Sequence, residues 1–236
     1  MSTLLQDLRF AARAFLRRPA FTAVAVLTLA LGIGLNTAVF SAVDALLLRP
    51  VPGVRSPDEL VQLFRSYPGG FDYGSNSIPH YRDLRERASG VFSDVAVWTY
   101  ASANLSAGGR TERIMAQIVS ANFFRLYGVG AARGRTFVAE EDAKPGAHPV
   151  AVLSHASWQG MFAGDPAVVG RTVLLNGNRY TIVGVAAPDF RGPIAMAVPV
   201  LWVPLMQLDQ IHPGSAARFE DRGTGCDRGF DDGGVI

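Results

Sequence analysis

The strongest constraint on the fold of this chain is an apolar run from Ala20 to Leu48, in which the first charged residue is Asp44. A helix needs about 20 apolar residues, each rising about 1.5 Å, to cross the hydrocarbon of a membrane. The segment from Phe21 to Val43 provides that length, and its polar interruptions are only hydroxyl groups and Asn36. The run therefore predicts a transmembrane helix over residues 19–48, in contact with membrane lipid.

Four arginines precede the run, at positions 9, 13, 17 and 18. Basic residues favour the cytoplasmic side of a membrane, so this asymmetry predicts a cytoplasmic N-terminus and a periplasmic domain after Leu48, with the helix in the cell inner membrane. The alternative is a secretory signal peptide cleaved near Ser41 or Ala42. Signal peptides usually have an apolar core of about 7–15 residues, whereas this one extends from Ala20 past Leu35. The length favours a permanent single-pass anchor.

Residues 1–18 have the pattern of an amphipathic helix. Leu4, Leu8 and Phe15 recur at helical spacing, while Arg9 and Arg13 follow a separate line. Such a helix lies along the inner membrane surface, with its apolar face in the lipid boundary and its arginines toward acidic headgroups. Packing on a cytoplasmic partner is the alternative that the same pattern leaves open.

Small residues recur at every fourth position of the apolar run. A face of this kind lets a second helix approach closely in lipid, where packing and hydrogen bonds drive association. We therefore interpret it as a helix-packing stripe, with another membrane helix as the partner. General alanine richness is the alternative explanation. The stripe consists of Ala30, Gly34, Ala38 and Ala42.

Composition sets weaker limits. The chain has 22 basic and 20 acidic residues and a formal net charge of +2. The basic residues after the first eighteen are scattered and balanced, so nucleic acid is not an expected partner. Cys226 is the only cysteine, so the outer domain must fold without an internal disulfide, which its size permits.

Residues 49–208 mix strand and helix patterns, which predicts an α+β domain. Its clearest element is a hairpin in which Asn176-Gly177 joins strands over 171–175 and 179–185, because this dipeptide accepts positive φ at both turn positions. Other predicted strands cover 60–65, 92–99, 113–119 and 150–153, with a turn at Gly108-Gly109. Predicted helices cover 77–88, 121–127 (capped by Ser120 and ended by Gly128) and 154–162. The candidate core residues are Phe124, Trp158, Phe162, Val173, Ile182 and Val185.

Motifs for chemistry are largely missing from the sequence. There is no G-x-x-x-x-G-K-[ST] phosphate loop, no H-E-x-x-H and no C-x-x-C. Ser154, His155 and Asp165 hold the residue types of a hydrolytic triad, but no G-x-S-x-G surrounds the serine. The four histidines show no metal-ligand spacing, and Asp94 and the acidic run 140–142 are expected to be solvated. We predict no catalytic, cofactor-binding or metal-binding residue.

Several ordered stretches resemble one transporter family. The sequence LLQDLRFAARAFLRRPAFTAVAVLTLALGIGLNTAVFSAVDALLLRPVP resembles the first transmembrane region of MacB/FtsX-like ABC transporter permeases. The stretches IVSANFFRLYGVGAARGRTF and VAVLSHASWQGMFAGDPAVVGRTVLLNGNRYTIVGVAAPDFRG resemble the MacB-like periplasmic core domain. The resemblance extends over roughly residues 1–208.

The resemblance implies a permease that has no catalytic residues of its own and works with a separate ATP-binding ABC subunit. It also implies that the helix packs in the membrane with a second copy of this chain or with a second permease half. ATP-driven movement of that subunit would be passed through the membrane helix to the periplasmic domain. A membrane-anchored binding or sensor module without transport activity is the alternative, and a tethered hydrolase using Ser154 is a third. Residues 209–236 are rich in glycine and charge, so we expect a flexible or aberrant tail and a truncated member of the family.

Overall fold

The computed structural model of the protein describes residues 18–44, 52–66, 74–194, 197–221 and 234–235. The chain divides into two units, residues 1–49 and 50–236, and each is described by itself. The predicted amphipathic helix and Cys226 lie outside the described residues, except for Arg18.

The first unit contains helix α2, Pro19–Val43. Proline is tolerated at this start because the first helical N–H has no partner within the helix. The 25 residues of α2 span about 37 Å, which exceeds the roughly 30 Å of membrane hydrocarbon. The hydroxyls of Thr28 and Thr37 each donate to the carbonyl four residues earlier, at 2.8 Å. Of the described helices, α2 alone has the length and composition to cross a membrane.

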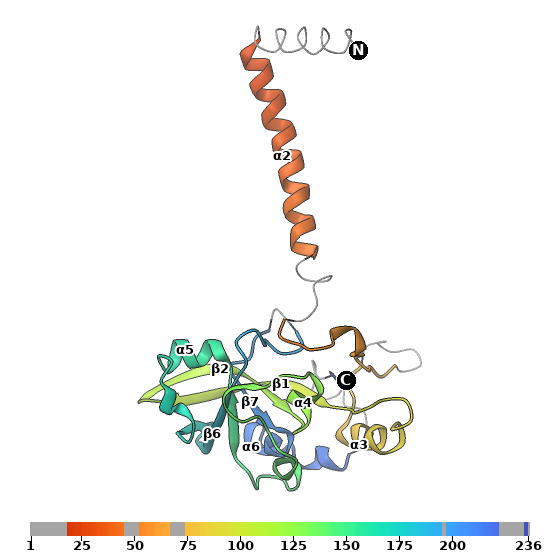
Figure 1. The fold of residues 1–236 in the computed structure, drawn as a ribbon, viewed down its shortest axis with the longest axis vertical. Coiled ribbons are helices and arrows are strands. Elements are labelled where there is room, and N and C mark those ends of the chain that lie inside the picture. The colour runs from red at the N-terminus through yellow and green to blue at the C-terminus, as the bar shows by residue number, and fades with distance from the viewer. Residues whose placement is uncertain (1–17, 45–51, 67–73, 195–196, 222–233, 236) are drawn as a thin grey trace. The chain divides into compact units, whose positions relative to one another are not determined.

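The second unit is an α+β domain built on a mixed sheet, as predicted (Figure 1). Six strands are hydrogen-bonded in the order β2-β7-β4-β6-β5-β1, and β1 also pairs with β2, so the pairings form a closed circuit. The pairs β2–β7 and β4–β6 are parallel, and the other pairs of this circuit are antiparallel. The strands are β1 (Val97–Ala107), β2 (Arg110–Val119), β4 (Val150–Leu153), β5 (Thr172–Leu175), β6 (Asn178–Ala186) and β7 (Leu201–Pro204).

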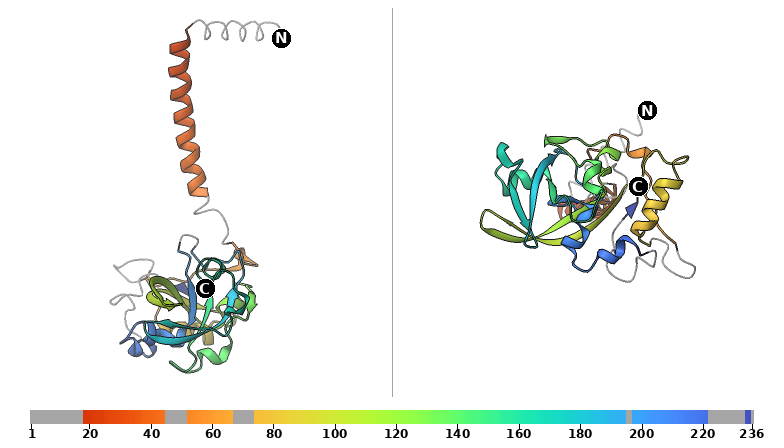
Figure 2. Two further views of the ribbon diagram at one scale, coloured as in Figure 1. Left: turned by 90° about the vertical axis from the view of Figure 1, so that its left-hand side faces the viewer. Right: turned by 90° about the horizontal axis from the view of Figure 1, so that it is seen from below.

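Two further strands extend this circuit. Strand β3, Ala131–Gly134, pairs with the end of β6, and β8, Gly234–Val235, pairs with the start of β1. Helix α3, Ile78–Arg87, and helix α5, His155–Met161, lie at opposite sides of the domain in the views of Figures 1 and 2.

The predicted hairpin at Asn176-Gly177 and the predicted turn at Gly108-Gly109 are confirmed. Asn176 and Gly177 have φ values of 50° and 85° and join β5 to β6, while Gly108 and Gly109 have φ values of 56° and 80° and join β1 to β2. The predicted strand over 92–99 is wrong in position, because β1 begins at Val97 and continues to Ala107. Small residues of weak strand propensity fill its second half, and they are held there by antiparallel pairing with β2.

Strand β7 is buried at all four positions because both faces of the sheet are covered there. Leu201 and Val203 pack in one apolar cluster and Trp202 packs in a second. The second cluster is aromatic and includes Phe124 of helix α4 (Phe123–Leu126), whose ring centroid lies 5.3 Å from that of Trp202. The sheet therefore separates two cores.

The predicted core residues fall on both sides of this division. Trp158, Val173, Ile182 and Val185 are buried in the first cluster, with the partly buried Phe162 packed against it. Phe124 is buried in the second, aromatic cluster. The prediction that these side chains are interior is confirmed for all but Phe162, but they do not form one packed group.

The positions of the helices agree in part with those predicted from the sequence. Helices α3 and α5 occur where predicted, and the hydroxyls of Ser77 and Ser154 accept the N–H groups of His80 and Ser157 at their N-termini. The predicted cap at Ser120 is wrong, because its hydroxyl accepts the N–H of Val97 from the neighbouring strand. Helix α4 is correspondingly shorter than the predicted 121–127.

Two other expectations differ from the structure. Residues 60–65 form no strand; they follow the 3₁₀ helix η2, Pro57–Glu59, and Arg65 makes an isolated bridge to Gly74.

Residues 209–221 do not behave as a tail. This segment contains helix α6, Leu208–Ile211, and the 3₁₀ helix η6, Ala216–Phe219. The side chains of Ile211 and Phe219 are buried in the first core cluster. Their contacts are with parts of the domain that are distant in sequence, so local composition did not predict them.

Candidate functional site

The packing stripe predicted for the membrane helix lies within α2. Ala30, Gly34 and Ala38 are exposed, and no described atom outside the helix lies within 4 Å of a Cβ built on Gly34. With about 100° of rotation per residue, these three positions fall within an arc of about 80°. Ala42 continues the helix on the same line. Asn36 lies about 160° around the axis from Gly34, on the opposite side of the helix, and is not part of this face.

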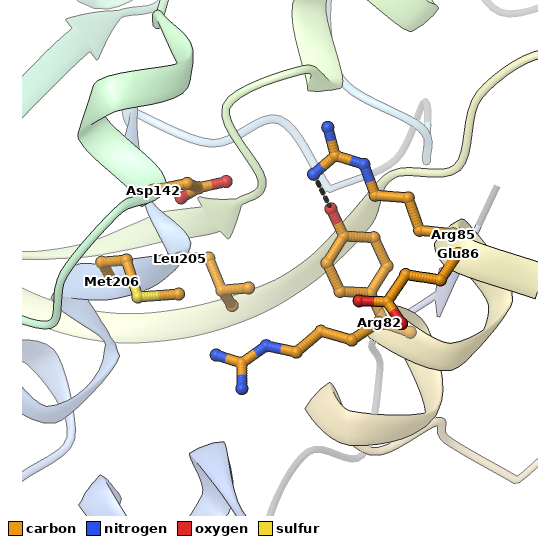
Figure 3. A pocket seen from close by; sticks show the side chains of 7 residues that line it. Arg82, Arg85, Glu86, Asp142, Leu205 and Met206 are labelled. Atoms are coloured by element: carbon orange, nitrogen blue, oxygen red, sulfur yellow. Dashed lines mark hydrogen bonds between the residues drawn. The ribbon is translucent and has the colours of Figure 1, made fainter.

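A pocket of about 480 Å³ lies in the folded domain, beside α3. Figure 3 shows Arg82 and Arg85 of α3 on one side, with Asp142, Leu205 and Met206 on the other. Asp142 ends the 3₁₀ helix η3, Ala139–Asp142, and the two apolar residues begin the 3₁₀ helix η5, Leu205–Gln207. Tyr81 and Glu86 of α3 complete the lining.

Helix α3 is fixed to the domain by its buried side, which includes Ile78 and Tyr81. Arg82 and Arg85 are exposed and lie about one helical turn apart. Arg82 Nη1 donates to the backbone oxygen of Phe219 at 3.2 Å, and Arg85 Nη1 donates to the hydroxyl of Tyr81 at 3.4 Å. Both acceptors are neutral, and no carboxylate of the described residues forms an ion pair with either guanidinium.

Asp142 is the acidic group of this pocket. Its Oδ2 accepts the backbone N–H of Ala121 at 2.5 Å, while the buried Oδ1 has no hydrogen-bond partner of good geometry in the described structure. Burial raises the pKa of Asp142 to about 6, opposed by the amide of Ala121 and the positive charge of Arg85. The amides of Leu205 and Met206 oppose the rise more weakly. Asp142 therefore changes its charge at a higher pH than an ordinary aspartate does.

The expected solvation of the acidic run 140–142 is wrong for two of its members. Besides Asp142, Glu141 is only 3% exposed, and its carboxylate accepts from Arg135 Nη2 at 2.8 Å and from the N–H of Val138 at 2.9 Å. The chain folds η3 against the domain and supplies partners for the buried charge.

Asp94 also has protein partners in place of full solvation. Its side chain accepts from Val95 N–H, Asn122 Nδ2 and Arg125 Nη2, at 2.9, 2.8 and 2.7 Å. It ties the start of β1 to α4.

The residues of the hypothetical triad have structural contacts of their own. Ser154 caps α5 and its hydroxyl lies 2.7 Å from that of Ser157, while the His155 ring packs on Trp158 at 5.3 Å. Asp165 Oδ1 accepts the N–H of Ala167 at the start of the 3₁₀ helix η4, Pro166–Val168, and its Oδ2 pairs with Arg171 at 2.9 Å. These contacts account for the three side chains without a triad.

The histidines lie in separate settings. His80 Nδ1 is 2.7 Å from Asn76 Oδ1, and burial together with Arg218 lowers the pKa of His212. Within the described ranges, no group of three or more His, Cys, Asp or Glu side chains is arranged to hold a metal ion.

The pocket beside α3 was missed by the sequence predictions. The local signal was Tyr81 followed by arginines at positions 82 and 85 on one predicted helix. The opposite wall comes from residues about 60 and 120 positions later in the chain, and no local pattern brings these segments together.

The comparisons with known proteins agree with the α+β architecture. The periplasmic region of MacB from Actinobacillus actinomycetemcomitans superimposes with a TM-score of 0.51 at 15% identity, covering 73% of this chain and 69% of that chain. At this identity the likeness shows the fold. No curated protein matches the sequence.

Two further solved structures show weaker similarity. A domain of a putative permease protein from Porphyromonas gingivalis has a TM-score of 0.49 at 15% identity, with coverage of 78% of this chain and 68% of that one. The extracellular domain of the noncanonic ABC-type transporter YknZ, from Gram-positive bacteria, has a TM-score of 0.40 at 16% identity, with coverage of 49% and 56%.

The family comparison covers both structural units. Residues 22–224 match the family described as the MacB-like periplasmic core domain, a range that starts inside α2 and continues beyond the last described residue of η6. The resemblance seen in the sequence is thereby confirmed. This chain is a member of the MacB-like periplasmic core domain family, with an apolar N-terminal helix followed by the α+β domain.

Proposed function

We propose that this chain is a permease subunit, or the N-terminal part of one, in a MacB/FtsX-like ABC transporter. The observation that carries the proposal is the family match over residues 22–224, which joins a membrane-length helix to the periplasmic core domain in one continuous range. In this proposal, residues 1–18 lie on the cytoplasmic side, 19–48 cross the inner membrane and the folded domain is periplasmic.

The proposed mechanism is mechanical. A separate ATP-binding subunit would hydrolyse ATP in the cytoplasm and move the membrane helices, and the periplasmic domain would change its arrangement in response. The closed circuit of strand pairings and the two buried cores support this role, because a domain packed on both faces of its sheet moves as a rigid body.

Helix α2 would meet another permease helix through its small-residue stripe. The supporting observation is the open surface at Ala30, Gly34 and Ala38, where no side chain larger than a methyl group keeps a neighbouring backbone at a distance. We propose either a second copy of this chain or a second permease half as the partner in the membrane.

The test is association of the full chain with an ATP-binding subunit. The tagged chain is crosslinked in its native membrane, purified and analysed by mass spectrometry, with an unrelated single-pass membrane protein carried through as control. The expected result is specific enrichment of a protein with Walker motifs. Recovery of the chain without any such protein, under conditions that preserve known transporter complexes, would contradict the transport proposal and favour an anchored binding module.

A further inference from the structure

We propose that the pocket between α3, η3 and η5 binds the carboxylate of a small organic acid that also carries an apolar group. This site is independent of the proposed association with an ATP-binding subunit, because it depends only on residues of the folded domain. Its volume of about 480 Å³ lies in the range of roughly 300–1,000 Å³ that is common for small-molecule sites.

The two arginines of α3 provide the anion-binding part. The guanidinium groups of Arg82 and Arg85 project to the pocket from successive turns of one helix (Figure 3). Each presents several N–H donors, and each uses one of them on a neutral oxygen, that of Phe219 or of Tyr81. The remaining donors have the geometry that carboxylates accept most strongly.

The opposite wall selects an acid with an apolar portion. Leu205 and Met206 line the pocket from η5, and the ring of Tyr81 lines it from α3. These three side chains are fixed in the core, with exposed fractions of 2%, 5% and 4%. A rigid apolar wall favours an aliphatic or aromatic group attached to the carboxylate.

The negative groups of the pocket favour a singly charged ligand. Asp142 and Glu86 are the two carboxylates in the lining, and both repel an anion when they are ionised. When all are ionised, these two carboxylates balance Arg82 and Arg85, so the lining has no net positive charge that would favour a doubly charged phosphate over a singly charged carboxylate. Phosphate also has no apolar group for Leu205 and Met206, so we assign an organic acid to the site.

Asp142 makes the proposed binding dependent on pH. Asp142 lines the pocket, so its ionised carboxylate repels an anion bound there, and protonation of the carboxylate removes that repulsion. The other charged or titratable groups of the lining are Tyr81, Arg82, Arg85 and Glu86 on α3, while η5 contributes only apolar lining residues. Because the pKa of Asp142 is about 6, the affinity should rise as the pH falls through that value.

The experiment uses the full chain in detergent micelles and ¹⁹F NMR of 4-fluorophenylacetate as the probe, up to about 10 mM. The uncharged 4-fluorophenylacetamide is the matched probe, and inorganic phosphate is the competitor near pH 8, where it is mostly doubly charged. The expected result is binding of the acid and no binding of the amide. The affinity for the acid should be about tenfold higher near pH 5 than near pH 8.

Variants locate the binding. Arg82→Gln and Arg85→Gln should each weaken binding of the acid at least about fivefold, whereas Arg87→Gln, an exposed arginine of α3 outside the pocket lining, should leave it unchanged. Asp142→Asn should strengthen binding about five- to tenfold near pH 8 and remove the pH dependence.

Four outcomes would overturn the proposal. These are no binding of the acid, equal binding of the amide, displacement by phosphate as effective as displacement by excess acid, and Arg82 or Arg85 variants that bind like the Arg87 variant. Circular dichroism of each variant separates loss of the site from loss of the fold.

Discussion

Trp202 Nε1 donates a hydrogen bond of 2.6 Å to Gln117 Oε1, and the two residues are direct neighbours on the parallel strands β7 and β2. Both side chains are fully buried. This hydrogen bond joins two polar side-chain groups within the apolar interior, and the indole N–H of Trp202 fixes the orientation of the Gln117 amide. Removal of the acceptor would leave the indole N–H unpaired where water does not reach it.

This geometry predicts the effect of Gln117→Met. The substitution keeps a similar side-chain length but removes the acceptor, so we expect a loss of about 1–3 kcal/mol in the free energy of unfolding. Urea denaturation followed by tryptophan fluorescence measures the loss. Met115→Gln, a change at an exposed position on the same strand, is the control and should change stability by less than about 0.5 kcal/mol.

Phe219 tests whether the segment after Leu208 belongs to the domain. Its side chain is 7% exposed and packs in the first core cluster, so Phe219→Ala should cost about 3 kcal/mol. Val91→Ala, at a side chain that is 80% exposed, should cost little. A deletion after Gln210 removes Ile211 as well as Phe219, and it should be more damaging than either substitution. An unchanged thermal melt of Phe219→Ala would place this segment outside the core.

The turn at Gly177 gives a third test. Its φ of 85° lies in a region that β-branched residues strongly disfavour, so Gly177→Val should destabilise the β5–β6 hairpin by about 1–2 kcal/mol or more. Gly177→Asn is the matched variant, because asparagine enters this region at lower cost, and it should lose clearly less. Equal losses in chemical denaturation would show that backbone conformation is not the cause.

The raised pKa of Asp142 predicts a pH-dependent stability. The folded-state pKa of about 6 lies above the ordinary value of 3.8, so the folded protein holds this proton more tightly than the unfolded chain. The resulting stabilisation is full below about pH 4 and is lost as the pH rises through about 6. Asp142→Asn should remove a pH-linked difference of about 2–3 kcal/mol between these limits.

Urea midpoints measured between about pH 4 and pH 7 check this prediction. Glu112→Gln, an exposed position on β2, should retain the pH dependence of the unaltered chain. A pH dependence that is the same in Asp142→Asn and in the unaltered chain would contradict the assignment to Asp142.

The helix-packing stripe is testable with two glycines of α2. Gly34 lies on the stripe, and Gly32 lies about 160° away around the helix; neither has a described atom within 4 Å of an added Cβ outside the helix. Gly34→Leu should lower crosslinking between membrane helices severalfold, because a larger side chain prevents close approach. Gly32→Leu adds the same volume to the other face and should have little effect. A similar loss of crosslinking in both variants would show that the small-residue stripe is not the contact face of the helix.

The parts of the fold that were predictable from the sequence have local causes. The Asn176-Gly177 turn needs positive φ at two positions, Gly128 ends a helix at a φ of 66°, and the apolar run before Asp44 meets the length requirement of a membrane. Each of these signals is contained within a few residues or one continuous segment, so contacts with distant residues did not alter the structure that it predicts.

The parts that were missed depend on contacts between distant segments. The hydroxyl of Ser120 was available to cap α4, but the N–H of Val97 from the neighbouring strand uses it. The second half of β1 forms a strand because β2 lies beside it. Asp142 is buried by segments around Ala121 and Leu205, which its own neighbours in sequence do not reveal.

Cysteine labelling tests most directly the proposal that this chain is anchored in the membrane by α2 with its folded domain outside the cytoplasm. In a Cys226→Ser background, single cysteines are introduced as Ser2→Cys and as Ser102→Cys, the latter at an exposed position of β1. A membrane-impermeant maleimide is applied to intact spheroplasts and to lysed ones. We expect the cysteine at 102 to be labelled in intact spheroplasts and to stay with the membrane, and the cysteine at 2 to be labelled only after lysis. Labelling of position 2 alone in intact spheroplasts, or release of the labelled domain as a soluble protein, would contradict it.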